Sequence, residues 1–158
     1  MEKTIFEYFD KDCVILGLKQ KNKKSILAAI LDHLIEKKKI NKNDKSKILK
    51  ALLQREQMGS TAIGGYIALP HARVDCVKDV VLCFAISKEG LDFNSLDQEP
   101  VHIIALLLSN QKEAGLHLKM LASLAKILRD KYFVNQLKEV SSEEEVLSLL
   151  NKQKRLFQ

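Results

Sequence analysis

The sequence has few of the residues and segments that mark several large protein classes. Its three cysteines form no Cys-x-x-Cys pair, so neither a disulfide framework nor a cysteine zinc site is expected. No apolar run approaches the roughly 20 residues of a membrane-spanning helix. The first residues, Met-Glu-Lys-Thr-Ile-Phe, lack the basic-then-apolar order of a signal peptide. We therefore expect a cytoplasmic protein with reduced thiols and no membrane insertion.

Motifs for metal and nucleotide chemistry are also missing. The four histidines show no helical pair such as His-Glu-x-x-His, which disfavours a metallohydrolase. The glycines between positions 59 and 65 are not followed by the lysine of a P-loop. We expect no metal and no cofactor. There is no repeat, linker or low-complexity segment, so we expect one domain over residues 1–158, with residues 1–8 and 152–158 as frayed ends.

Acidic residues are fewer than basic ones, and the formal net charge is +6. The excess comes from lysines in residues 19–24 and 37–47. These clusters are interrupted by other residues and have no aromatic side chains among them, so they are more typical of a solvated helix face than of a nucleic-acid site. A basic nucleic-acid-binding module remains the alternative from another functional class, and it would bind DNA with steep salt dependence. We expect no nucleic-acid partner.

Apolar patterning predicts strands alternating with helices, and hence an α/β domain with helices on both faces of a central sheet. Short apolar runs predict strands near residues 13–18, 67–69, 80–86 and 101–108. Three- and four-residue spacing predicts helices near residues 23–38, 44–57 and 113–130, and a capping box at Ser141 or Ser142 opens a last one. His33 should lie on a wet helix face, and His102 should serve packing or lie at the surface.

One stretch, residues 55–73, concentrates the residue types that position chemistry. It reads Arg-Glu-Gln-Met-Gly-Ser-Thr-Ala-Ile-Gly-Gly-Tyr-Ile-Ala-Leu-Pro-His-Ala-Arg. Pro70 favours extended geometry at the preceding residue and offers no N–H, so we expect His71 where a strand ends. Arg55 or Arg73 could neutralise an anion through a planar donor fork.

The same stretch indicates a phosphohistidine site. A neutral imidazole, with an ordinary pKa of about 6.5, has a free lone pair at neutral pH and needs no separate base. The amides and hydroxyls of Gly59, Ser60 and Thr61 could bind phosphoryl oxygens. His71 is therefore the predicted acceptor.

The stretch resembles the active-site signature of the enzyme IIA domains of the fructose, mannitol and nitrogen-regulatory branch of the bacterial phosphotransferase system. Glu56, then Ile63 and Gly64, then residues 67–72 reading Ile-Ala-Leu-Pro-His-Ala fall at the spacing of that family. Length, the order of elements and a second histidine extend the similarity over nearly the whole chain. The resemblance implies a mixed sheet of about five strands.

His117 shares one face of its helix with three leucines, a pattern that by itself favours a core histidine. The resemblance places the second active-site histidine of the family at this position. His71, His117 and Arg55 are then the expected catalytic residues, and Gly59, Ser60 and Thr61 the expected phosphate-binding residues.

The resemblance also implies a phosphocarrier rather than a free-standing metabolic enzyme. The donor would be the phosphocarrier protein HPr or its nitrogen-branch relative. Two roles remain open: a phosphorylation-dependent regulator of a kinase or transporter, or a sugar-transport component passing the phosphoryl group to an enzyme IIB. The sequence shows no phosphate-accepting cysteine loop of a fused enzyme IIB, which favours the regulatory role.

Overall fold

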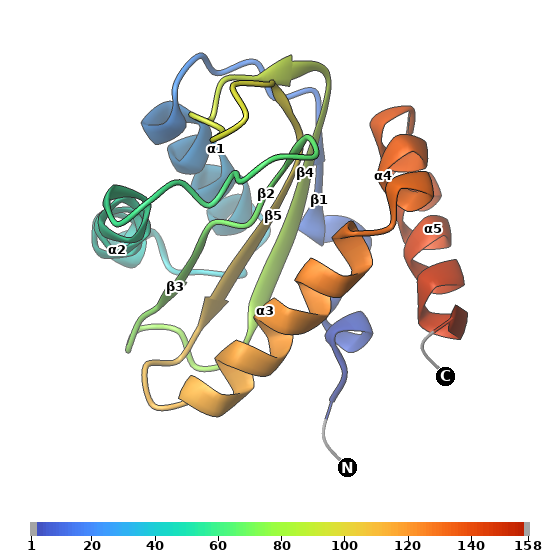
Figure 1. The fold of residues 1–158 in the computed structure, drawn as a ribbon. Coiled ribbons are helices and arrows are strands. Elements are labelled where there is room, and N and C mark those ends of the chain that lie inside the picture. The colour runs from blue at the N-terminus through green and yellow to red at the C-terminus, as the bar shows by residue number, and fades with distance from the viewer. Residues whose placement is uncertain (1–2, 157–158) are drawn as a thin grey trace.

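The computed structural model describes residues 3–156 and is built on one mixed sheet of five strands (Figure 1). The spatial order is β1, β4, β5 and then the edge formed by β2 and β3. The strands span the following residues: β1 Val14–Leu16, β2 Ile67–Ala68, β3 His71–Arg73, β4 Val81–Leu91 and β5 Val101–Ser109. The expected mixed sheet of about five strands is confirmed.

The centre of the sheet is the antiparallel pair β4 and β5, and the outer strands run parallel to their neighbours. β2 and β3 pair with successive parts of the same strand: Ile67 lies opposite Ile103, and His71 lies opposite Leu107. Pro70 stands between the two short strands and has no N–H for the ladder. The edge of the sheet is therefore interrupted just before His71.

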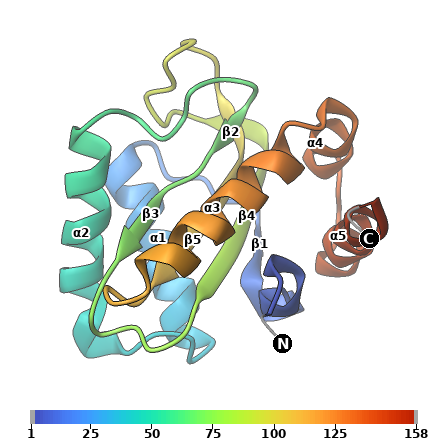
Figure 2. The same cartoon turned by 60° about the horizontal axis from the view of Figure 1, so that its bottom comes forward.

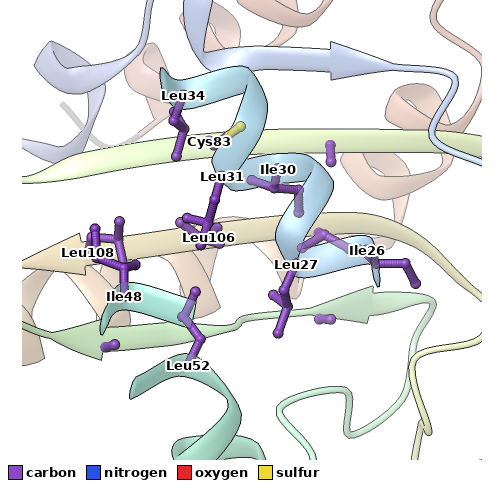
Figure 3. Packing of buried hydrophobic residues seen from close by; sticks show 14 of the residues in the cluster. Ile26, Leu27, Ile30, Leu31, Leu34, Ile48, Leu52, Cys83, Leu106 and Leu108 are labelled. Atoms are coloured by element: carbon purple, nitrogen blue, oxygen red, sulfur yellow. The ribbon is translucent and has the colours of Figure 1, made fainter. Parts of the chain in front are cut away.

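Helices α1 (Lys23–Glu36) and α2 (Lys45–Gln57) cover one face of the sheet (Figure 1). Their buried aliphatic side chains meet Cys83, Leu106 and Leu108 of the central strands, as Figure 3 shows. A fully buried aliphatic side chain contributes about 1.5–3 kcal/mol to the free energy of folding. This layer fixes α2, whose last turn carries Arg55, beside β3.

Helices α3 (Ala114–Leu128), α4 (Lys131–Lys138) and α5 (Glu143–Leu156) lie on the other side, and α3 crosses in front of β3 and β5 in Figure 2. A second apolar cluster joins this layer to the sheet, with Phe84 and Leu107 on the strands and Leu124 and Phe133 on the helices. The prediction of helices on both faces is confirmed. α3 brings its first turn to the edge where His71 lies.

The described part of the chain also contains three short 3₁₀ helices: η1 Ile5–Tyr8, η2 Lys11–Cys13 and η3 Lys42–Asp44. The expectation of frayed ends is wrong for the described part of both ends, because Ile5 and Gln153 are buried and α5 runs to Leu156. Ile5 belongs to the second apolar cluster, and the side chain of Gln153 donates to Asp130 at 3.2 Å. Residues 1–2 and 157–158 lie outside the described part of the chain.

Two local predictions need correction. α4 was not predicted, because its eight residues show little more than two apolar turns; the side chain of Asp130 caps it by accepting from the N–H groups of Tyr132 and Phe133. His33 does not lie free on a wet face, since its Nε2 is 2.8 Å from the carbonyl oxygen of Asp12 and therefore donates to it. His102 is half-buried, with its Nδ1 donating to the carbonyl oxygen of Ser87.

Two of the three thiols lie within the packed layers, and Cys76 is half-buried. Cys13 and Cys83 are buried, and burial raises the pKa of Cys13 to about 11. Between residues 3 and 156, no helix is long and apolar enough to cross a bilayer, and no three histidine, cysteine or acidic side chains gather into a metal-binding group. The described cysteines are all free thiols.

Candidate active site

The interrupted edge of the sheet fixes the imidazole of His71. The residue opens β3 rather than ending a strand as predicted, because Pro70 divides the edge into two short strands. The carbonyl of Pro70 accepts the N–H of Leu107 at 3.0 Å, which anchors the turn to β5. The Nδ1 of His71 lies 2.8 Å from the carbonyl oxygen of Leu69. A carbonyl can only accept, so Nδ1 carries the proton and Nε2 carries the lone pair.

Arg55 approaches His71 from the last turn of α2. Its Nε donates to Nε2 of His71 at 3.3 Å, which agrees with a lone pair on that nitrogen. Its Nη1 donates to the carbonyl oxygen of Gly59 at 2.8 Å. Gly59 has a φ of 140°, a backbone conformation that L side chains rarely adopt. The glycine turn after α2 thus holds the guanidinium next to the unprotonated nitrogen of His71.

His117 approaches from the opposite layer, in the first turn of α3. The centroids of its ring and the His71 ring are 5.4 Å apart, with 51° between the ring planes. Its Nδ1 lies 2.6 Å from Oγ of Ser109, the last residue of β5. The two histidines predicted from the sequence are therefore neighbours. They and Arg55 come from three different elements, β3, α3 and α2, and the two helices lie on opposite faces of the sheet.

Arg55, His71 and His117 line an open cavity of about 620 Å³. Its wall combines polar groups with apolar ones at the rim, where Met58 and Leu118 are 83% and 66% exposed. A second cavity, of about 730 Å³, lies at the far end of α1 and is lined mainly by lysines and aliphatic side chains. The smaller cavity is the candidate site because it alone of these two holds the histidine pair.

Burial keeps both imidazoles neutral. Desolvation, followed by the positive charge of Arg55, lowers the pKa of His71 below its ordinary value. Desolvation, followed by the repulsion that protonated His71 and Arg73 would exert, lowers the pKa of His117 from 6.5 to about 4. Neutral imidazole is the nucleophilic form. Near neutral pH the site therefore presents one unprotonated nitrogen beside a permanent cation.

The structure does not bring the side chains of Ser60 and Thr61 into this cavity. Oγ of Ser60 donates to the carbonyl oxygen of Phe93 and accepts from the N–H of Ala62. The hydroxyl and the N–H of Thr61 both donate to Glu56. Gly59 meets the site through its carbonyl and not its N–H. In this structure the three residues shape the loop that carries Arg55 instead of forming the expected cradle.

Glu56, next to Arg55, is the anchor of that loop. Its carboxylate is buried and accepts from Nζ of Lys23 at 2.9 Å, besides the two groups of Thr61. Lys23 also lies over the ring of Phe93, 5.0 Å from its centroid. A buried carboxylate must be paired and hydrogen-bonded, and here every such need is met by protein groups. The first turn of α1 is thereby tied to the end of α2.

Sequence reasoning named Arg73 as a possible partner for an anion, but it left out Gln54 and Gln111 of the cavity wall and Ser109, which lies behind the wall and bonds to His117. Arg73 follows His71 by two positions on β3, so strand alternation places both side chains on one face. The same alternation in β5, whose Ser109 lies opposite Arg73, points Ser109 toward α3. Gln54 and Gln111 also line the cavity, but no pattern in the sequence singled them out. Ser109 could not be predicted as a neighbour of the site without knowing the parallel register of β3 and β5.

The arrangement defines a class of site. A neutral ring nitrogen faces an open cavity, and an arginine fork and a second imidazole stand beside it. Such a site can form a bond to an electrophilic phosphorus and bind the oxygens around it, which makes the chain a candidate histidine phosphocarrier.

Comparison with known proteins identifies the family. The family model for the phosphoenolpyruvate-dependent sugar phosphotransferase system, EIIA 2, matches residues 7–153, and the chain belongs to this family. The nitrogen regulatory protein of Bradyrhizobium diazoefficiens is 30% identical over 88% of this chain and 89% of its own length. The crystal structure of the nitrogen regulatory protein IIA-Ntr from Neisseria meningitidis matches with a TM-score of 0.82 at 29% identity, over 92% of this chain and 98% of that chain.

A second group of relatives carries transport names. The fructose-specific EIIABC component of Bacillus subtilis is 31% identical over 93% of this chain, but the chain spans only 23% of that protein. The fructose-specific EIIA component of Haloferax volcanii is 30% identical over 81% of this chain and 82% of its length. The structure of the mannitol IIA of Escherichia coli shares the fold, with a TM-score of 0.70 at 24% identity. The membership of the enzyme IIA family that the signature predicted is thus confirmed.

The buried pair of Glu56 and Lys23 predicts a large effect on stability. Glu56→Gln should lower the free energy of unfolding by roughly 3 kcal/mol, because it leaves a nearly buried ammonium without a counter-charge. Urea unfolding followed by circular dichroism measures the change. Removing Lys23 as well, in the double variant Lys23→Met with Glu56→Gln, should restore part of the loss. A loss under about 0.5 kcal/mol in the single variant would show that the pair of Glu56 and Lys23 does not stabilise the fold.

The lowered pKa of His117 predicts a pH dependence of stability. The unfolded chain takes up a proton near pH 6.5, whereas the folded protein does so only near pH 4. Stability should therefore be complete above pH 6.5 and fall as the pH drops from 6.5 toward 4. His117→Gln should reduce this slope, measured as urea unfolding at pH 7.5, 6.0 and 5.0. His71 contributes in the same direction, so part of the slope should remain. A wild-type stability that rises between pH 6.5 and 5 would contradict this.

Proposed function

We propose that the protein is a phosphocarrier of the phosphotransferase system that accepts a phosphoryl group on Nε2 of His71 from phospho-HPr or its nitrogen-branch relative. The observation that carries the proposal is the pair of bonds on the His71 ring. Nδ1 is bound to the carbonyl oxygen of Leu69, and Nε2 faces Arg55 in the open cavity. The reactive nitrogen is therefore fixed in protonation state and in direction before any partner arrives.

In the proposed transfer, the lone pair of His71 Nε2 forms a bond to phosphorus while the nitrogen–phosphorus bond of the donor histidine breaks. The electrons of that bond stay on the donor ring. Phosphoryl transfer asks mainly for in-line positioning and stabilisation of the equatorial oxygens. Arg55 and His117 are placed to bind those oxygens, and we propose them as the other catalytic residues. No metal or cofactor enters these steps.

We propose that Gly59, Ser60 and Thr61 serve phosphate binding through Arg55. Their hydrogen bonds to the guanidinium, to Phe93 and to Glu56 hold the turn after α2. This differs from direct binding by the hydroxyls. It agrees with the wall of the cavity, which Arg55 lines and these three residues do not.

For the fate of the phosphoryl group, we propose a phosphorylation-dependent regulatory role. Support comes from the Bradyrhizobium relative, which matches over 89% of its length, and from the structural match to the Neisseria protein. The alternative is transfer to an enzyme IIB, which the name of the B. subtilis EIIABC component supports.

We further propose that residues 1–158 form one domain of this type. Phosphoenolpyruvate, which the family description names, is a cytoplasmic metabolite, so we propose a cytoplasmic location.

A nucleic-acid-binding role receives no support from the structure. Four lysines of the basic clusters pair with aspartates: Lys37 with Asp12, Lys39 with Asp10, Lys45 with Asp32 and Lys47 with Asp75. These pairs lie at or near the surface, where they contribute little to stability. They do reduce the field that the lysines would offer to a phosphate backbone. We therefore propose no nucleic-acid partner.

The acceptor assignment predicts that His71→Gln abolishes phosphorylation. Purified protein incubated with phosphoenolpyruvate, enzyme I and HPr should gain one acid-labile phosphate by intact mass, and the variant should gain none. His102→Gln is the matched control, because His102 is also half-buried and donates through Nδ1 to a backbone carbonyl. A His71→Gln variant that still gains the phosphate would refute the assignment.

The placement of His117 predicts a weaker effect. His117→Ala should still accept the phosphoryl group in part, since the nucleophile and Arg55 remain, but it should pass the group on more slowly. Loss of one oxygen-binding donor in a transfer site costs about 10²- to 10³-fold in rate. Rapid-quench transfer from the phosphorylated variant back to HPr measures the step. An unfolded circular dichroism spectrum would show a packing role instead.

A further inference from the structure

Ser109 has no role in the proposed transfer, yet it is fully buried and directly bonded to His117. It ends β5, and its backbone carbonyl accepts the N–H of Val74. Its Oγ lies 2.6 Å from Nδ1 of the imidazole, among the shortest contacts of the site. We propose that Ser109 is a positioning residue that fixes the tautomer of His117, so that the proton sits on Nε2 and is offered to the oxygens of a phosphoryl group on His71. This inference rests on the proposed function of His71.

The direction of the hydrogen bond follows from what each group can do. Ser109 is 0% exposed, and the described residues offer its hydroxyl proton no acceptor other than Nδ1 of His117. If the imidazole donated through Nδ1 instead, the hydroxyl proton would be buried without a partner, which costs about 1–3 kcal/mol. Donation from Oγ to Nδ1 satisfies both groups with one bond. The hydroxyl is therefore the donor.

The opposite nitrogen then carries the proton. Neutral imidazole has one N–H and one lone pair, so accepting at Nδ1 leaves the N–H at Nε2. Within the cavity, the Nε2 of His71 already presents a lone pair to Arg55. If Nε2 of His117 were unprotonated as well, it would present a second lone pair to the phosphoryl oxygens. The tautomer set by Ser109 gives the pocket one nucleophile and one donor from two identical side chains.

A hydroxyl also suits the charge of the site better than a carboxylate would. A carboxylate bonded to Nδ1 favours the imidazolium. Burial, His71 and Arg73 instead keep His117 neutral, with a pKa of about 4. Because the hydroxyl leaves His117 neutral, the imidazole is not repelled by the positive charges of Arg55 and Arg73 when no phosphoryl group is bound. Ser109 thus orients the ring without charging it.

The chain offers a matched set of variants. Ser109→Ala removes the donor and leaves the rest of the side chain, whereas Ser109→Thr keeps a hydroxyl and should rescue. Ser87→Ala is the control, because Ser87 is a buried strand serine whose Oγ accepts the N–H of Gly90, away from the cavity. Circular dichroism and urea unfolding establish that each variant is folded.

Two measurements separate positioning from mere packing. Nitrogen-15 NMR of the histidine rings reports which nitrogen of His117 is protonated, without any phosphoryl donor. Rates of phosphate gain, by intact mass, are measured with phospho-HPr and with the small donor potassium phosphoramidate. Wild type should show a protonated Nε2. Ser109→Ala should show a mixture of tautomers and gain phosphate about tenfold more slowly with both donors, as loss of one buried hydrogen bond implies.

Each outcome has one reading. A wild-type His117 protonated on Nδ1, or a Ser109→Ala variant with unchanged tautomer and rate, overturns the proposal. An equal loss of rate in Ser87→Ala also overturns it, since the effect would then be general. If wild type has the expected tautomer but gains phosphate from neither donor, the proposed function of His71 fails while the assignment of the proton by Ser109 is supported.

Discussion

The hydrogen bond from Nδ1 of His71 to the carbonyl of Leu69 is the contact on which the site depends. It is local, spanning two residues across Pro70, and it decides which ring nitrogen is protonated. It exists because the proline divides the edge strand and leaves the preceding carbonyl free to face the ring. Everything else in the cavity is arranged around the nitrogen that this bond leaves bare.

The two layers of the domain contribute different parts to that arrangement. The layer of α1 and α2 supplies the cation, Arg55, and braces it through the buried pair of Glu56 and Lys23. The layer of α3 supplies the second imidazole, which β5 orients through Ser109. Because β5 is shared by both apolar clusters, it sets the spacing between the two contributions. The 5.4 Å between the centroids of the two rings therefore depends on how both helical layers pack against the sheet.

The sequence allowed most of the fold and the centre of the site to be predicted. Apolar spacing and a capping box located four of the helices, apolar runs located four of the five strands, and the stretch of residues 55–73 contained His71 and Arg55. Ser60 and Thr61 could not be placed, because a hydroxyl beside glycines can face either an anion or its own loop. Here the buried carboxylate of Glu56 takes the two donors of Thr61. Ser109 was not predicted because its role depends on parallel register with β3, which apolar spacing does not encode.

The parallel pairing at the edges of the sheet also bears on how the molecule is made. β1 joins β4, and β2 and β3 join β5, across long intervening segments, and non-local pairing of this kind slows folding. β3 reaches its register only after β5 has been synthesised, and α3 follows later still. The cavity between β3 and α3 therefore cannot assemble on a nascent chain until β5 and α3 have both emerged from the ribosome.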